Sequence, residues 1–242
     1  MTGDADISVP ARALGDPARG RIVTALLGGR AIPAGELAHA AGVSASTASE
    51  HLRVLLDAGV VTVDRVGRNR FFRLTNDEVA RAVEALQAIA PRTVVQSFRQ
   101  HRASEELREA RTCYDHLAGD LGLRVTDLLV HASILSSIRT AATENAPSPF
   151  PAGPVVESLR LHPGSGPRPW SRGCLDWTGR RAHVAGQVGA QILEAMETQQ
   201  WITRRPDSRA VRLTDRGALG LSNLETTVGG RGAKLGLVDE LR

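Results

Sequence analysis

The sequence predicts a mainly α-helical α+β protein in which small β-hairpin wings accompany the helices. Two observations predict an N-terminal winged helix-turn-helix. Apolar residues recur at helical spacing through Ala34–Leu56, and a short alternating strand pattern follows over Val60–Leu74. The third observation is the length of 242 residues, which is enough for a second domain of ordinary size. We therefore expect a winged helix-turn-helix domain followed by a separate C-terminal domain.

The helix-breaking Pro91 is the predicted boundary between the two domains. Residues 1–90 form the first domain, residues 91–225 the second, and the glycine-rich residues 226–242 a flexible tail. Within the second domain we expect one long helix over Val94–Leu117 and a strand in the stretch VVESLRL. A hairpin pattern ending in LTDRG makes a second winged-helix-like fold one interpretation of this domain.

Composition and charge restrict the class of protein. The net charge is +4, and arginine supplies almost all of the basic charge, with Lys234 as the single lysine. A modest positive excess suits DNA binding through local patches rather than through a uniformly basic surface. No apolar run reaches membrane-spanning length, and no signal peptide precedes the first helix, so we expect a cytoplasmic protein without a membrane partner.

The stretch Ala34–Leu56 has the pattern of two short helices joined by a tight turn. Gly42 suits the turn, and Ser44 is a good N-cap for the second helix. Ala48, Leu52 and Leu55 make one apolar face at helical spacing, and the opposite face is small, polar or charged. An ordinary αα-hairpin is the alternative interpretation. If the second helix lies in a DNA groove, the base-reading residues are Ser46, Ser49 and Glu50.

The hairpin after this helix carries four arginines, which suits contacts to phosphates or the minor groove. A merely solvated hairpin is the weaker interpretation because of its position directly after the helix-turn-helix. The residues predicted to hold the DNA backbone or minor groove come from both elements: Ser44, Thr47, Arg53, Arg65, Arg68, Asn69 and Arg70.

Together, the opening ALGDPARGRIVTALL, the block GELAHAAGVSASTASEHLRVLLDAGVV and the wing DRVGRNRFFRL resemble the winged helix-turn-helix domain of the ArsR family of bacterial transcriptional regulators. The resemblance covers about residues 12–88. It implies a homodimeric repressor, not an enzyme, that binds double-stranded promoter DNA and is released by an effector. It also implies that the helix Asp77–Ile89 makes the dimer.

The chain departs from this family at the usual metal positions. One family metal site uses two cysteines on the first helix of the helix-turn-helix, where this chain reads IPAGELAHAA. Another uses histidine and acidic residues on the dimerisation helix, where NDEVARAVEAL holds no histidine. The resemblance therefore supports no metal site at either place. Glu50 is a second departure, and it would accept a hydrogen bond from cytosine N4 or pair with an arginine such as Arg53.

The C-terminal half holds its own sensing candidates. Cys113 and His116 are three residues apart, which places them on one face of the predicted helix. Cys174, Asp176 and His183 form a second cluster. The two cysteines and two histidines could bind zinc, or the thiols could form a redox switch. Another hypothesis is a small-molecule pocket, and the last is a set of ordinary buried residues. The full set of effector-binding candidates is Cys113, Tyr114, His116, Trp170, Cys174, Asp176, Trp177 and His183.

Two other classes of function compete with a DNA-binding regulator. An enzyme is disfavoured because the sequence has no phosphate loop, nucleophile elbow or dinucleotide fingerprint. A protein-interaction module with a relic DNA-binding fold stays open, as does the identity of any effector or cofactor.

Overall fold

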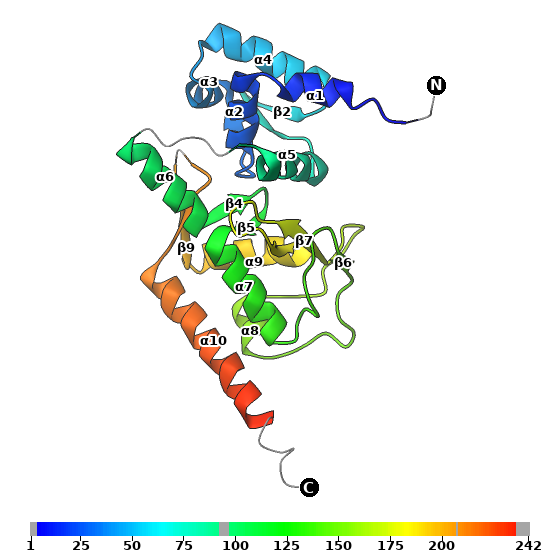
Figure 1. Ribbon diagram of the computed structural model, residues 1–242, viewed down its shortest axis with the longest axis vertical. Helices are drawn as coiled ribbons and strands as arrows, with labels where there is room; N and C mark the ends of the chain where they lie inside the picture. Colours follow the sequence, from blue (N-terminus) through cyan, green and yellow to red (C-terminus); the bar gives the residue numbers. More distant parts are fainter. Residues whose placement is uncertain (1–3, 92–96, 207, 236–242) are drawn as a thin grey trace. The chain divides into compact units, whose positions relative to one another are not determined.

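The computed structural model describes residues 4–91, 97–206 and 208–235. The chain divides into two compact units, Met1–Leu86 and Gln87–Arg242 (Figure 1). We refer to them as unit 1 and unit 2. Among the described residues, no helix is both long enough and apolar enough to cross a membrane.

Unit 1 is a winged helix-turn-helix. Its sheet has the order β1-β3-β2 with antiparallel pairing, and α2, α3 and α4 pack around it. The side chain of Asp16 caps α2 by accepting hydrogen bonds from the backbone N–H groups of Ala18 and Arg19. The elements in order are α1 (Ser8–Leu14), α2 (Pro17–Leu26), β1 (Ile32–Pro33), α3 (Ala34–Ala41), α4 (Ala45–Asp57), β2 (Val61–Val66), β3 (Asn69–Leu74) and α5 (Asp77–Ile89), whose last turn passes the boundary of the unit.

The core of unit 1 consists of aliphatic side chains and one phenylalanine. Ile22, Leu37, Leu55 and Phe72 come from α2, α3, α4 and β3, and all are almost completely buried. Burying each such side chain stabilises the fold by about 1.5–3 kcal/mol. The helical spacing seen in the sequence thus fixes which face of α4 packs inward and which stays on the surface.

Unit 2 combines helices with three small antiparallel sheets among its described residues. The long helix α10 packs against α7 and α8 (Figure 1). The elements are α6 (Phe98–Glu109), β4 (Arg111–Cys113), β5 (His116–Ala118), α7 (Gly119–His131), β6 (Thr143–Glu144), α8 (Pro154–Ser158), β7 (Ser171–Leu175), β8 (Ala182–Ala185), α9 (Gly186–Thr198), β9 (Ile202–Arg204), β10 (Val211–Leu213) and α10 (Asp215–Leu235).

Two hairpin–helix modules form the centre of unit 2. The first is β4-β5-α7 and the second is β7-β8-α9. The strand-to-helix turn reads HLAGDLG in the first and HVAGQVG in the second. Gly119 and Gly186 occupy the same place in the two turns, with φ of +77° and +85°, a region that favours glycine. The modules interlock, because α7 packs against β8 and α9 packs against β5.

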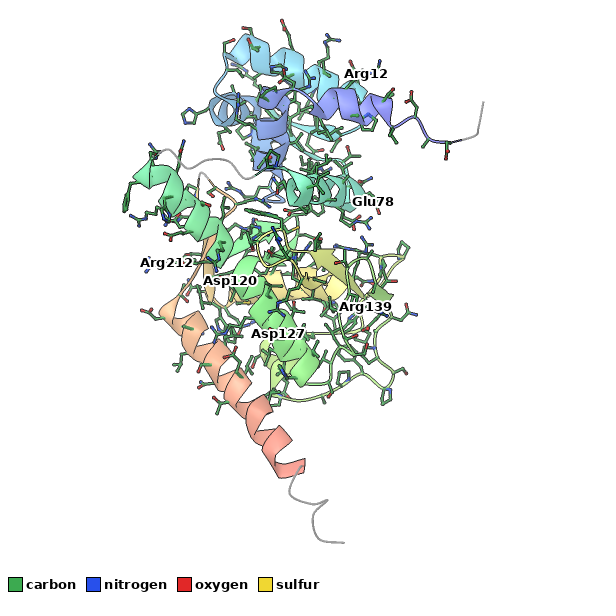
Figure 2. The ribbon with its side chains drawn as sticks, viewed as in Figure 1. Arg12, Glu78, Asp120, Asp127, Arg139 and Arg212 are labelled. Atoms are coloured by element: carbon green, nitrogen blue, oxygen red, sulfur yellow. The ribbon has the colours of Figure 1, made fainter. Side chains whose placement is uncertain are left out.

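A salt bridge also ties the two modules together. Asp127 lies on α7 (Figure 2), and its carboxylate accepts two hydrogen bonds from Arg181, which precedes β8, at 2.6 and 2.8 Å. Both side chains are about half exposed, so this bidentate pair adds little to stability but marks the contact between the modules.

Three expectations for the second half of the chain are wrong. The helix predicted over Val94–Leu117 ends at Glu109, and the chain then forms the β4-β5 hairpin; residues 92–96 lie outside the described residues. The strand predicted in VVESLRL is the short helix α8, which starts with Pro154 at a position where proline is preorganised for a helix. The tail predicted from residue 226 continues α10 to Leu235, and residues 236–242 lie outside the described residues.

Candidate functional site

The helix-turn-helix has the local structure that its sequence predicts. Gly42 adopts a left-handed conformation with φ of +67° at the end of α3. The Ser44 side chain caps α4 by accepting a hydrogen bond from the Thr47 backbone N–H at 3.2 Å. Leu52 and Leu55 are buried on the inner face of α4. The outer face is therefore held in a fixed orientation by the core beneath it.

The outer face of α4 exposes Ser46, Ser49, Glu50 and Arg53. The Ser49 hydroxyl donates a hydrogen bond to the Ala45 carbonyl oxygen at 2.9 Å, so its lone pairs remain for an incoming donor. Arg53 forms an ion pair with Asp57 at 3.4 Å and not with Glu50. This arrangement decides against the Arg53 pairing considered for Glu50.

The wing is the β2-β3 hairpin. A two-residue turn of Gly67 and Arg68 joins the strands, with φ of +61° at the glycine. Arg65 and Arg70 are directly opposite each other in the register, and both are exposed. Like charges opposite each other destabilise a strand pair in water. A polyanion such as the DNA backbone would attract both arginines and offset the repulsion between them.

The ten predicted DNA-contacting residues all lie on α4, its cap or the wing of unit 1. Nine of them are exposed, and Thr47 is half-buried. The Ser44 hydroxyl already has local partners. Besides capping α4, it lies 2.9 Å from the hydroxyls of Ser46 and Thr47. The sequence-based assignment of these residues to DNA contacts stays a prediction.

In unit 2 the structure brings together Cys113, His116, Cys174 and His183. Cys113 pairs with His116 across the β4-β5 hairpin, and Cys174 pairs with His183 across β7-β8. The expectation that Cys113 and His116 share a helical face is therefore wrong, because the local chain is a tight hairpin. The cross-strand register still places each cysteine beside its histidine. We call these four residues the Cys-His centre.

The Cys-His centre is compact and buried. The two Sγ atoms are 3.8 Å apart, and the Nε2 atoms of the two histidines are 3.1 Å apart. One ligand atom from each residue lies within 4.8 Å of all the others. The exposed fractions are 1% for Cys113, 4% for His116, 5% for Cys174 and 0% for His183. The two thiols are not joined in a disulfide.

Each histidine of the centre has a carboxylate behind it. Nδ1 of His116 lies 3.3 Å from Oδ1 of Asp115, and Nδ1 of His183 lies 3.4 Å from Oδ2 of Asp176. Burial alone would lower the pKa of His116, but the neighbouring Cys113 and Asp115 outweigh burial and raise that pKa to about 9.

The two carboxylates are held ionised by cations. Burial would raise the pKa of Asp115, yet its contacts with His116 and Arg168 hold that pKa well below the usual range. The pKa of Asp176 is likewise lowered, because the nearby His183 and the charge of Arg111 outweigh burial. Both acids therefore stay acceptors at neutral pH, which orients the imidazole rings.

Sequence reasoning missed Arg111 as a part of this site. Its side chain is completely buried and donates to Asp176 Oδ2 at 3.1 Å and to Thr178 Oγ1 at 3.2 Å. Its guanidinium also lies 4.7 Å from the ring centroid of Trp177. Asp176 receives further backbone hydrogen bonds from Gly119, Thr178 and Gly179. Only the arginine in ARTCYDH could have signalled this buried pair, and arginines are usually exposed.

The three aromatic candidates make different contacts. Trp170 is 3% exposed in the core of unit 2 and donates through Nε1 to the His162 carbonyl oxygen at 2.9 Å. Trp177 stacks on Arg111, and Tyr114 lies in the β4-β5 turn with φ of +61°. A cavity of about 870 Å³ lies elsewhere in unit 2, between α7, α8 and the stretch of α10 around Glu225 and Val228, and no effector candidate lines it.

Comparison with known proteins supplies the family. A family model described as a helix-turn-helix domain matches residues 14–64. The HTH-type transcriptional regulator YdfF of Bacillus subtilis is 38% identical over 208 residues, which cover 85% of this chain and 91% of that protein. The HTH-type transcriptional regulator CmtR of Mycobacterium tuberculosis is 41% identical over 75 residues, covering 31% of this chain and 63% of that protein.

A solved structure of CmtR, named there as a cadmium metal-sensor, has 34% identity with a TM-score of 0.31 and covers 38% of this chain and 94% of that one. The similarity to YdfF extends through both units, whereas the similarity to CmtR is limited to about a third of the chain. The chain therefore belongs to the ArsR family of winged helix-turn-helix DNA-binding transcriptional regulators, in a long form with an additional C-terminal domain.

Proposed function

We propose that this regulator is a homodimeric repressor that binds a specific site in double-stranded promoter DNA and is released by an effector acting on unit 2. The observation that carries the DNA-contact assignment is the exposed Arg65–Arg70 pair beside the polar face of α4. This pairing is unfavourable in the absence of an anion. The regulator would work in the cytoplasm, where its DNA is, and it would act by binding rather than by catalysis.

The proposed contacts divide by chemistry. Ser46, Ser49 and Glu50 read base edges, since small polar side chains let a helix approach the major groove and a carboxylate accepts from cytosine N4. The remaining residues hold phosphates or the minor groove and fix the position of the protein: Ser44, Thr47, Arg53, Arg65, Arg68, Asn69 and Arg70.

The proposed dimer uses α5. Leu86 and Ile89 are 48% and 81% exposed, and they are three residues apart, so they form one apolar stripe. An exposed apolar stripe on a helix is stabilised when a second copy covers it. A dimer also presents two recognition helices to two half-sites, which supports binding to a palindromic operator.

The test is a footprint of the full-length protein on the DNA upstream of its own coding region, with a scrambled fragment of equal length as control. We expect protection of a short palindrome and at least 1,000-fold weaker binding to the scrambled fragment. Transcription from the protected promoter should fall when the protein is added. Equal affinity for both fragments would instead support the alternative of a protein-interaction module with a relic DNA-binding fold.

A further inference from the structure

We propose that the Cys-His centre, made of Cys113, His116, Cys174 and His183, is a tetrahedral binding site for one Zn²⁺ ion. The four residues come from two hairpins that lie far apart in the sequence, and the fold brings their ligand atoms together in the interior of unit 2. This set of two thiolates and two imidazoles is one of the common zinc ligand sets.

The spacing of the ligand atoms agrees with a tetrahedron around zinc. Zn–S bonds of about 2.3 Å give a sulfur–sulfur edge of about 3.8 Å, and Zn–N bonds of about 2.0–2.1 Å give a nitrogen–nitrogen edge of about 3.3 Å. The observed Sγ–Sγ and Nε2–Nε2 distances are 3.8 and 3.1 Å. All other ligand-atom separations are within 4.8 Å, and a tetrahedral sulfur–nitrogen edge is about 3.5 Å, so closing around the ion needs an approach of about 1.3 Å at most.

The orientation of the imidazoles also suits a metal ion. Asp115 and Asp176 each lie beside Nδ1 of one histidine, which favours the proton on Nδ1 in both rings. With Nδ1 turned toward a carboxylate in both rings, Nε2 is the nitrogen that each ring offers to the centre, and the two Nε2 atoms face each other at 3.1 Å. A carboxylate on the far nitrogen of a metal-binding histidine is the usual outer arrangement of zinc sites.

The scaffold around the centre holds the ligands and the carboxylates behind them in place. Each hairpin–helix module contributes one cysteine and one histidine at paired positions of its hairpin. Arg168 holds Asp115 through two hydrogen bonds, and the buried Arg111 holds Asp176. An ion bound by all four ligands would cross-link the two modules. If the two cysteines were only buried apolar residues, they would not require the ion pairs Arg168–Asp115 and Arg111–Asp176 behind the histidines.

Thiolate ligands select a soft or borderline ion. Calcium and magnesium prefer oxygen ligands, and the centre offers none directly, since both carboxylates lie behind the histidines. Zinc is the commonest ion for two sulfurs and two nitrogens in tetrahedral geometry. The site itself stands on the geometry of unit 2. That its occupancy is the signal for DNA release rests on the proposed function.

The test measures metal binding by the full-length protein, purified with a reductant and stripped with a chelator. Added Co²⁺ serves as a probe because its visible bands report tetrahedral thiolate coordination, and Zn²⁺ should displace it. We expect one ion per chain. The Cys113→Ser, Cys174→Ser double variant should lose the sulfur-to-cobalt band, and His101→Asn, which changes an exposed histidine of α6, should bind as wild type.

A second variant keeps the test decisive if the double variant fails to fold. Asp115→Asn leaves all four ligands in place but removes the carboxylate behind His116, so the dissociation constant for Zn²⁺ should rise about 10–100-fold. The circular dichroism spectrum checks that this variant keeps its fold. An unchanged dissociation constant would contradict the proposed outer arrangement.

Three results would overturn the zinc site: no bound ion with both thiols titratable, a Cys113–Cys174 disulfide under reducing conditions, or cobalt bands that survive the double variant. Operator binding is measured on the same samples. Loss of the site with specific DNA binding intact would overturn only this inference. Stoichiometric zinc with no operator recognition would overturn only the proposed function.

Discussion

At the residue scale, the proposed contacts of the wing with DNA depend on single arginines. Arg68 lies at the tip of the hairpin, in the two-residue turn after Gly67, and it is exposed. A side chain there can reach a phosphate or the minor groove without touching the rest of the unit. Its removal should therefore change DNA binding and leave the free energy of unfolding unaffected.

We expect Arg68→Ala to weaken binding to operator and random DNA by a similar factor. The slope of log K against log salt concentration should become shallower by about 1, because one fewer counterion is released. Fluorescence anisotropy across a salt series measures both. Arg139→Ala, which removes an exposed arginine of unit 2 (Figure 2), is the matched control and should behave as wild type. A loss confined to the operator would contradict a phosphate role.

Arg111 is a buried arginine, and we expect it to stabilise the fold of unit 2. Arg111→Met keeps most of the side-chain volume but leaves Asp176 charged and buried without its partner. The free energy of unfolding of unit 2 should fall by about 3–5 kcal/mol, as for other broken buried pairs. Urea unfolding followed by circular dichroism measures it. Arg181→Met breaks the half-exposed pair with Asp127 and should cost about 1 kcal/mol or less. Equal losses in the two variants would refute this distinction.

At the scale of elements, the sequence predicts the features that depend on local interactions, such as helix caps and turns. The cap Ser44 and the turn glycine Gly42 mark the helix-turn-helix, and the structure has both of them where expected. The β4-β5 hairpin was missed because its strands have three residues each, too short for a period to show. Its identity depends on pairing and burial within unit 2, which no single segment reveals.

The strand-to-helix turn of the first module can be tested directly. Gly119 has φ of +77°, and a Cβ there would lie 2.5 Å from the Arg108 carbonyl oxygen. We expect Gly119→Ala to lower the free energy of unfolding by about 1–3 kcal/mol, because both the backbone and the neighbouring chain must shift. Gly20→Ala is the control, since a Cβ in the middle of α2 meets nothing within 4 Å.

Both variants are compared by thermal and urea unfolding of the full chain. The control should be neutral or stabilising by up to about 1 kcal/mol, as expected for alanine in a helix interior. If Gly119→Ala were equally harmless, the two HxAGxxG turns would not need glycine, and the geometric likeness of the modules would lose its explanation.

At the scale of the whole molecule, the Cys-His centre depends on topology rather than on local sequence. The two thiols are 61 residues apart in the chain and the two histidines 67. The sequence identified all four residues as candidates from their chemistry, and it could not show that they meet. That convergence requires two interlocked modules, with each helix packed on the strand of the other.

The proposed dimer also belongs to the scale of the whole molecule. Ile89 is 81% exposed on α5, and a charge at this position should prevent a second copy from covering the stripe. Each buried isoleucine contributes about 1.5–3 kcal/mol, and a symmetric dimer buries two copies. Ile89→Glu should therefore raise the dimer dissociation constant about 100-fold or more. Light scattering coupled to size-exclusion chromatography measures this change.

Operator binding should weaken in parallel, since a monomer reaches only one half-site. Leu219→Glu is the matched control, because Leu219 is 65% exposed on α10 of unit 2 and lies outside the proposed stripe. It should leave the mass in solution and the operator affinity unchanged. If Ile89→Glu stayed dimeric with full affinity while Leu219→Glu dissociated, the interface would lie on α10, and control of DNA binding would act through unit 2 directly.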